Sequence, residues 1–368
     1  MELIFWKYML CHLQSSYIRE LSATSGVRVS VIVDREMENG RAEQGWLVPD
    51  FGKARIEVTQ DRKRVREIIA SSSPDSIHIL NGYRDVKLLG IALRELLRSD
   101  RHFGLLAEPG VSVGLKGLVG PAMYRLHCLR FWNRFDFVLA IGTRGADWFR
   151  ARGYPQQKTF PFAYITETYR HLAVANGGDG GTVQLIFVGQ LIPRKGLDLA
   201  LRALGRLRDA NWKLSVIGCG PRQKTLQALA RKLSISDKVT FLGAMKNEEV
   251  TNRLKTADLL ILPSRYDGWG AVTNEALMCG VPVLCSHQCG AQDLLDAPDR
   301  GEVFRAGSVP DLHAALSRRM ARGKLKDCER ERIREWSRCI SGRPAADYFL
   351  TVMRHVYDQA PRPVAPWL

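Results

Sequence analysis

The chain has 368 residues, 45% of them hydrophobic and 25% charged, as in ordinary soluble globular proteins, and this length is sufficient for two domains with separate cores. No apolar run reaches the roughly 20 residues of a membrane-spanning helix, so we expect none. The formal net charge of +16 predicts attraction to an anionic partner, such as nucleic acid, a lipid surface or a phosphorylated substrate.

The apolar start of the chain, Glu2 to Leu13, is interpreted as a buried strand that runs into a loop. It is too short for a signal peptide and no small-residue cleavage site follows it, so we expect a cytoplasmic protein. Eight cysteines without a CxxC pair also argue against a secreted disulfide scaffold. One group of residues has two possible roles: Cys279, Cys285, His287 and Cys289. They form a zinc site, or the thiols are small apolar side chains packed at the end of a buried strand.

Short apolar runs alternate with helix-like segments up to residue 174, which predicts an N-terminal domain around a parallel sheet. The expected strands are ELIF (2–5), RVSVIVD (28–34), SIHIL (76–80), FGLLAE (103–108) and FDFVLAIG (135–142). Between the last two lies a segment, 112–135, that is basic and aromatic and has no acidic residue. Its charged and apolar positions are Lys116, Arg125, Arg130, Arg134, Leu115, Leu118, Phe131 and Trp132. It suits an anionic membrane surface, and equally a helix whose apolar side is core.

The glycine-rich stretch ANGGDGG predicts a linker at residues 175–182. After it the expected strands are VQLIFVG (183–189), KLSVIG (213–218), KVTFLG (238–243), ADLLILP (257–263) and PVLC (282–285). Helix-like segments separate them, which predicts a second domain over 183–342 and then a C-terminal helix, 343–368, that packs back on the first domain. The predicted fold class is α/β, with two Rossmann-like doubly wound parallel sheets and ligands beyond the carboxyl ends of the strands, in a cleft.

One segment of the second domain, SRYDGWGAVTNEALMCGVPV (264–283), places two carboxylates eight positions apart around a glycine-rich turn. We expect a helix from Ala271 to Cys279, ended by Gly280, whose N-terminal amides and dipole favour a phosphate. Carboxylates beside an anion make sense if they accept hydrogen bonds from hydroxyl groups attached to it, as in a nucleotide sugar. In the alternative, Asp267 caps the helix and Glu275 is merely solvated.

A basic pair, Arg194 and Lys195, follows the first strand of the second domain in the loop QLIPRKG. Two adjacent cations at the carboxyl edge of a sheet can clamp a diphosphate, although an exposed basic turn is the alternative. The later sequence IGCGP (217–221) fails as a dinucleotide fingerprint, because the third glycine and the acidic residue of that motif are absent.

The region from Leu185 to Gly290 resembles the donor-binding half of the retaining family 4 glycosyltransferases, the glycosyl transferases group 1, which have the two-domain GT-B fold. The motifs that carry the resemblance are Gly189-Gln190-Leu191 with Lys195-Gly196, Gly218-Cys219-Gly220-Pro221, Phe241-Leu242-Gly243, and Pro263-Ser264 leading into Asp267 through Val283. About a hundred residues match in order, whereas the N-terminal half is only loosely similar.

The resemblance implies a role for each matching position. Glu275 accepts from ribose hydroxyls, Asp267 contacts the transferred sugar, and Lys195 holds the diphosphate. The remaining donor-side positions are Arg194, Gln190, Gly218, Leu242, Gly268, Trp269, Gly270 and Ala271. On the acceptor side we place Glu108, where relatives have a cleft histidine, and His12. A plain turn at Glu108 and a structural His12 remain alternatives.

The chain departs from the family pattern at three places. Asp267 replaces a glutamate and is one methylene shorter. Either the backbone lies closer to the sugar, or the carboxylate contacts a different sugar hydroxyl. Gln190 stands where a diphosphate-binding arginine is usual, and Arg194 is the candidate to substitute for it. The N-terminal glycine pair that often approaches the donor is missing.

The sequence thus predicts a glycosyltransferase that moves a sugar from a nucleoside diphosphate to an acceptor hydroxyl, with retention and without a metal or cofactor. A lipid-linked glycan of polysaccharide biosynthesis is the expected acceptor, an anionic membrane surface a further partner, and a peripheral position on the cytoplasmic face of the membrane the expected location. Nucleic acid is not expected as a partner. The alternatives are a sugar-nucleotide epimerase of the same fold and a basic nucleic-acid-binding protein.

Overall fold

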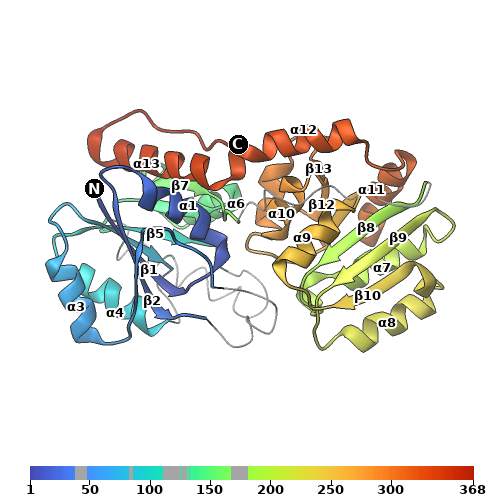
Figure 1. The fold of residues 1–368 in the computed structure, drawn as a ribbon, viewed down its shortest axis with the longest axis horizontal. Helices are drawn as coiled ribbons and strands as arrows, with labels where there is room; N and C mark the ends of the chain where they lie inside the picture. The colour runs from blue at the N-terminus through green and yellow to red at the C-terminus, as the bar shows by residue number, and fades with distance from the viewer. Residues whose placement is uncertain (38–47, 83–85, 111–124, 126–130, 132, 167–180) are drawn as a thin grey trace. The chain divides into compact units, whose positions relative to one another are not determined.

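The computed structural model describes residues 1–37, 48–82, 86–110, 125, 131, 133–166 and 181–368 (Figure 1). These residues form two compact units, the first of which holds those before residue 167 together with Ile340–Pro366. The second holds residues 181–339 with the last two residues of the chain. Most of the expected linker 175–182 and of the basic segment 112–135 lies outside the described residues.

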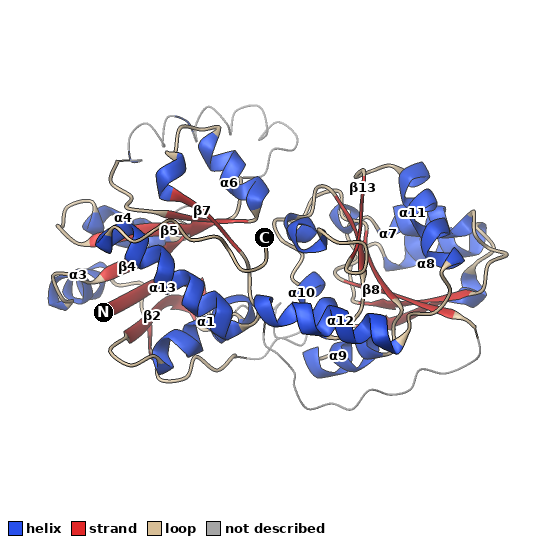
Figure 2. Ribbon diagram, turned by 90° about the horizontal axis from the view of Figure 1, so that it is seen from above, coloured by secondary structure: helices blue, strands red, loops and turns tan. Residues whose placement is uncertain are grey.

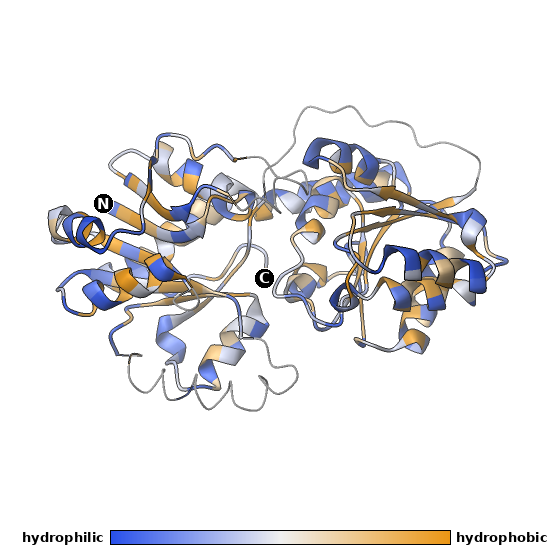
Figure 3. Ribbon diagram, turned by 90° about the horizontal axis from the view of Figure 1, so that it is seen from below, coloured by the Kyte–Doolittle hydropathy of each residue, from blue (hydrophilic) through white to orange (hydrophobic). Residues whose placement is uncertain are grey.

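The first unit is built on a seven-stranded parallel sheet with the order β3-β2-β1-β4-β5-β6-β7. Its strands are β1 (Glu2–Met9), β2 (Arg28–Arg35), β3 (Arg55–Val58), β4 (Ile77–Asn81), β5 (His102–Ala107), β6 (Val138–Ile141) and β7 (Thr159–Phe162). The central strands are apolar because helices cover both faces, and Figure 3 shows hydrophobic residues concentrated on them. Leu3 of β1, for example, pairs with Val29 of β2 and Ile77 of β4.

Helices surround this sheet: α1 (His12–Ala23), α3 (Arg62–Ser71), α4 (Lys87–Leu96), α6 (Thr143–Arg150) and, from the end of the chain, α13 (Gly342–Asp358). The C-terminal helix α13 packs against α1. The ring of Phe349 lies 5.8 Å from that of Phe5 and 6.3 Å from that of Tyr17. At Gly342 a Cβ would lie 2.8 Å from the carbonyl oxygen of Ser16, so this close approach requires glycine.

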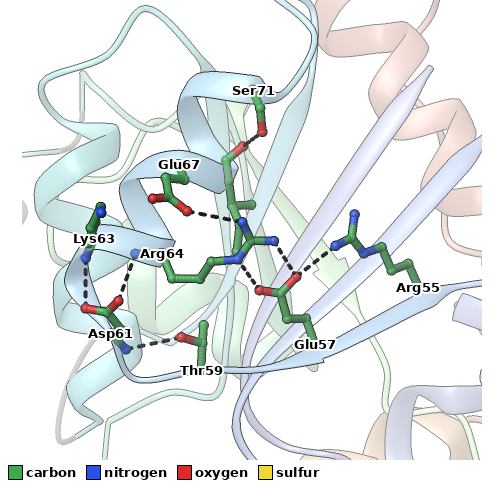
Figure 4. Close-up of polar contacts among 9 residues, drawn as sticks. Arg55, Glu57, Thr59, Asp61, Lys63, Arg64, Glu67 and Ser71 are labelled. Atoms are coloured by element: carbon green, nitrogen blue, oxygen red, sulfur yellow. Dashed lines mark hydrogen bonds and ion pairs between the residues drawn. The ribbon is translucent and has the colours of Figure 1, made fainter.

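The edge strand β3 is attached to α3 by charged side chains (Figure 4). Arg64 donates to both carboxylate oxygens of Glu57, at 2.6 and 3.0 Å, and these bonds lower the pKa of Glu57. Asp61 caps α3 by accepting from the backbone amides of Lys63 and Arg64. Part of the chain's positive charge is therefore used within the fold rather than for a partner.

The second unit has a six-stranded parallel sheet with the order β10-β9-β8-β11-β12-β13. Its strands are β8 (Val183–Val188), β9 (Trp212–Ile217), β10 (Val239–Gly243), β11 (Leu259–Leu262), β12 (Val283–Ser286) and β13 (Gly301–Phe304). Helices α7 (Leu197–Gly205), α8 (Gln223–Lys232) and α11 (Val309–Ala321) pack together on one face, and α9 (Asn247–Lys255), α10 (Val272–Met278) and α12 (Asp327–Ser337) on the other (Figure 2).

The predicted fold class is confirmed, and every strand expected from the sequence is present. Three further strands, β3, β7 and β13, were not predicted, and all three lie at sheet edges. Edge strands are short and carry charged residues or proline, as β7 does at Pro161, so they lack a continuous apolar run. None of the helices in the described part of the chain has the length and hydropathy that a bilayer crossing requires.

Candidate active site

The candidate site of the second unit lies at the carboxyl ends of β8 and β11. These two strands are neighbours, but from β8 the chain continues toward one edge of the sheet and from β11 toward the other. Open α/β sheets bind ligands at such a switch point, because the loops diverge there and leave room for a ligand. The loop after β8 carries Gln190, Arg194 and Lys195, and the loop after β11 carries Asp267.

These two loops meet through an ion pair that joins residues 72 positions apart in the chain. Lys195 Nζ lies 2.6 Å from Asp267 Oδ2, and Arg194 NH1 lies 3.5 Å from Asp267 Oδ1. The Ser264 hydroxyl also donates to Asp267 Oδ2, at 3.3 Å. The carboxylate and the ammonium are largely shielded, with 10% and 16% of their side chains exposed, whereas 44% of the Arg194 side chain is exposed.

Backbone contacts fix the position of the cationic loop. Gly196 has φ +68°, and a Cβ there would lie 2.0 Å from the carbonyl oxygen of Pro263, at the end of β11. The amide of Arg265 donates to the carbonyl of Arg194 at 2.8 Å, and the Arg194 guanidinium donates to the carbonyl of Tyr266 at 3.0 Å. The backbone of Arg194 and Lys195 is therefore fixed beside the loop that carries Asp267.

Gly218 brings a third loop, which follows β9, to the same edge of the sheet. Its φ is +127°, and a Cβ would lie 2.1 Å from the carbonyl oxygen of Gly189. The amide of Leu191 donates to the carbonyl of Cys219 at 2.9 Å. Gln190 is half-buried in the first of these loops, and Leu242 is half-buried near the end of the edge strand β10.

The turn before α10 is more enclosed than the sequence suggested, since Gly268, Trp269 and Gly270 are all buried. Gly270 has φ +92°, and a Cβ would lie 2.7 Å from both Cys289 Sγ and Leu262 Cδ2, so packing alone requires a glycine there. The Trp269 indole Nε1 donates to Asn274 Oδ1 at 2.8 Å.

Further along this segment, Ala271 is half-buried and lies directly before α10. The helix is one residue shorter at each end than predicted, and Gly280 follows it with φ +74°.

Glu275 lies one turn into α10 and is half-buried. Desolvation raises the pKa of its carboxyl to about 7. Near neutral pH this side chain is therefore present in both protonated and ionised forms, and it can donate a hydrogen bond as well as accept one.

The predicted acceptor-side residues lie in the first unit. Glu108 is exposed after β5. Burial, and after it the negative charge of Glu108, raises the pKa of the Tyr164 phenol. His12 is buried at the start of α1.

The sequence analysis missed Lys7, only 1% exposed inside β1, which donates to Gln14 Oε1, while Gln14 Nε2 donates to Asn81 Oδ1 at 2.9 Å. Burial lowers the pKa of Lys7. A lysine within the apolar run ELIFWKYM was the available signal.

The three cysteines of the candidate zinc site are buried in the second unit: Cys279, Cys285 and Cys289. Cys289 Sγ donates to the carbonyl of Trp269 at 2.7 Å, which gives this thiol a place in the fold of the turn. Among the residues that the structure describes, no three His, Cys, Asp or Glu side chains gather as a possible metal site.

Residues 173–336 match the family model described as "Glycosyl transferases group 1". A GDP-mannose-dependent alpha-(1-6)-phosphatidylinositol monomannoside mannosyltransferase of Mycolicibacterium smegmatis is 31% identical over 148 residues, which cover 38% of this chain and 39% of that protein. An alpha-D-kanosaminyltransferase of Streptomyces kanamyceticus is 27% identical over 227 residues, 58% of this chain and 57% of that protein. The chain thus spans less than two thirds of the length of these curated relatives.

Two solved structures are similar over nearly the whole chain. A glycosyltransferase of Rickettsia africae has a TM-score of 0.72 at 12% identity. The match covers 98% of this chain and 99% of the chain of that structure. Anabaena Alr3699/HepE in complex with UDP-glucose has a TM-score of 0.66 at 16% identity, with coverages of 98% and 99%. Residues 173–336 are thus similar to the glycosyl transferases group 1, and the chain has the GT-B fold of two doubly wound units.

Proposed function

We propose that the chain is a glycosyltransferase that moves a sugar from a nucleoside-diphosphate sugar to a hydroxyl of an acceptor. The observation that carries the proposal is the meeting of Lys195, Arg194 and Asp267 at the switch point of the second sheet. Two clustered cations suit a diphosphate, and a neighbouring carboxylate suits sugar hydroxyls. The GDP-mannose dependence of the similar mannosyltransferase and the UDP-glucose complex of HepE support a nucleotide-sugar donor.

Each residue has a chemical task in this proposal. Lys195 and Arg194 bind the diphosphate and stabilise the charge that develops on it as the glycosidic bond to phosphate breaks. Glu275 forms hydrogen bonds with the ribose hydroxyls. Because its pKa is raised, the carboxyl can donate such a bond when protonated and accept one when ionised. The backbone from Gly268 to Ala271, with Gln190, Gly218 and Leu242, lines the donor side. Glu108 and His12 belong to the acceptor side.

The transfer is further proposed to retain the anomeric configuration and to need no metal. The two cations would then perform the charge neutralisation that a divalent ion performs elsewhere. Asp267 and Glu275 would act mainly through binding, unlike the acid and nucleophile pair of glycoside hydrolases. Proton NMR of the product would establish the configuration, and turnover in EDTA with and without added Mg²⁺ or Mn²⁺ would test the metal independence.

A lipid-linked glycan is the proposed acceptor class, with the protein acting peripherally at the cytoplasmic face of a membrane in polysaccharide synthesis. The net charge of +16 supports an anionic surface as a partner. The phosphatidylinositol monomannoside in the name of the relative from Mycolicibacterium smegmatis supports an acceptor at such a surface.

The direct test measures nucleotide binding and transfer together. Isothermal titration with UDP, GDP and their sugars is expected to give binding for at least one base, with affinity reduced at least tenfold in Lys195→Ala. Glu275→Ala is expected to abolish transfer while the protein stays folded, as a cooperative thermal unfolding transition would show. A transfer that proceeds unchanged in both variants would refute the site, and conversion of the donor without any acceptor would indicate an epimerase instead.

A further inference from the structure

The Asp267 carboxylate contacts the same two cations that the proposed function assigns to the diphosphate. One oxygen lies 2.6 Å from Lys195 Nζ and also accepts from Ser264, and the other lies 3.5 Å from Arg194 NH1. A diphosphate bound by these cations must therefore share or replace the carboxylate's contacts. Two anions would then compete for one pair of positive charges.

The carboxylate is the fixed partner in this competition. The Asp267 amide donates to the carbonyl of Gln288 at 3.0 Å, and the Asp267 carbonyl accepts from the amide of Gly290 at 3.2 Å. These bonds attach its backbone to the loop after β12 on both sides, as a parallel bridge to Cys289. The short aspartate side chain has little freedom to swing away, since it has one rotatable bond fewer than glutamate.

The side chains of the two cations have more rotatable bonds than the aspartate and can turn while their backbone stays in place. The Arg194 side chain is 44% exposed, and lysine and arginine both have long flexible side chains that can turn toward a new anion. Lys195 has three N–H donors, of which the hydrogen bond to Asp267 uses one. A diphosphate can thus draw both cations toward itself while the carboxylate stays in place.

We propose that Asp267 is a built-in competitor of the diphosphate for Lys195 and Arg194, and that it determines how tightly the site holds a nucleoside diphosphate. This inference rests on the proposed function. A fixed negative charge that contacts the same two cations weakens phosphate binding, on the order of 10- to 100-fold when solvent screens part of the repulsion. An intact donor compensates, because its sugar hydroxyls can donate to the carboxylate that the cations have left.

The free product lacks that compensation. After transfer the nucleoside diphosphate has no sugar to bond Asp267, so the repulsion stands alone and the ion pair with Lys195 re-forms as the product leaves. The carboxylate thereby favours the donor over the product at the same cations. Product release becomes faster at the expense of overall phosphate affinity.

Asp267→Asn is the informative substitution, because the amide keeps the size of the side chain and removes its charge. Titration calorimetry with UDP and GDP at low salt is expected to show at least tenfold tighter binding of the nucleoside diphosphate than in the wild type. The gain should shrink as salt is raised. Damage to the fold weakens binding, so a gain in affinity cannot come from a merely structural role.

Three companion variants and one substitute variant complete the experiment. Asp267→Glu keeps the charge and is expected to bind within about threefold of the wild type. Glu302→Gln removes an acidic charge at the start of β13, where Glu302 pairs with Arg318, and is expected to change nothing. Combining Asp267→Asn with Lys195→Ala should abolish the gain, since the competition acts through that ammonium. Asp267→Ser replaces the asparagine variant if the latter is unstable, with the same expected gain.

The outcomes separate the inference from the proposed function. The competition is supported if Asp267→Asn or Asp267→Ser binds UDP or GDP more tightly than the wild type and the double variant with Lys195→Ala shows no such gain. Equal or weaker binding in a folded Asp267→Asn or Asp267→Ser variant, with a wild type that binds, overturns the competition and leaves the glycosyltransferase proposal intact. Absence of UDP and GDP binding in the wild type and in both variants overturns the two together.

Discussion

Gly196 lies so close to the carbonyl oxygen of Pro263 that a Cβ at Gly196 would stand 2.0 Å from it. This contact joins the loop that follows β8 to the end of β11, and it is what allows Lys195 to reach Asp267. The left-handed φ of +68° makes glycine favourable there for a second reason.

Gly196→Ala is expected to disturb both stability and nucleotide binding. The clash is with backbone, which cannot give way cheaply, so we expect a loss of about 2–3 kcal/mol in the free energy of unfolding. Binding of UDP or GDP should weaken in the same variant, because Lys195 is displaced. Gly307→Ala is the matched control: its φ is +78°, but a Cβ there meets nothing within 4 Å. A Gly196 variant no worse than this control would contradict the steric argument.

The raised pKa of Glu275 predicts a pH dependence of stability. Below about pH 4.5 the carboxyl is protonated in the folded and the unfolded chain alike. Between about pH 4.5 and 7 the unfolded chain ionises while the folded protein keeps the proton, so the free energy of unfolding falls as pH rises. Above about pH 7 the loss is complete.

Glu275→Gln removes this dependence. Relative to the wild type, its free energy of unfolding is expected to gain up to about 3 kcal/mol between pH 4.5 and pH 8. Urea unfolding of both proteins across this range measures the difference. Parallel pH profiles would show that the folded carboxyl ionises normally.

Phe349 is expected to be essential for the docking of α13 in the first unit. The side chain is fully buried, and its ring contacts the rings of Phe5 and Tyr17. Phe349→Ala should lower the free energy of unfolding by about 3–5 kcal/mol, through lost burial and the cavity left behind. Urea unfolding is the measurement, and Val364→Ala, at a side chain that is 79% exposed, is the control expected to have little effect.

The proposed membrane surface predicts salt-sensitive binding to anionic vesicles. The protein should sediment with vesicles of phosphatidylcholine and phosphatidylglycerol at low salt and remain in solution with phosphatidylcholine alone. Binding should be lost near 1 M salt, where the screening length falls to about 3 Å. Lys116→Glu with Arg130→Glu should weaken it more than Lys224→Glu with Lys232→Glu on α8, which makes the same change of net charge. Equal effects of the two pairs would remove the basic segment 112–135 from this role.

The fold class could be predicted from the sequence because a strand covered on both faces must be apolar along its whole length. The runs at 183–189 and 257–263 are of this kind, and they form β8 and β11. The edge strands β3 and β7 could not be recognised in this way, since β3 carries Arg55 and Glu57 and β7 contains Pro161. Such residues fit an edge, where the backbone pairs with a neighbouring strand on one side only.

The candidate site was only partly accessible from the sequence. Asp267, Glu275 and the basic pair stood out by residue type and spacing. The burial of Trp269 and the steric demand of Cys289 on Gly270 did not, because both depend on the loop after β12 folding over the turn. Lys7 was overlooked because its burial depends on Gln14 and Asn81, which come from α1 and β4.

By itself, the sequence determined the strands that have a continuous apolar run, the glycines of the loops, and the charged residues at the ends of those strands, because these properties follow from local composition and period. Only the tertiary structure decided that Lys195 and Arg194 face Asp267. That pairing depends on the order in which parallel strands assemble, and β8 and β11 become neighbours only when two intervening strands are placed on the far side of β8.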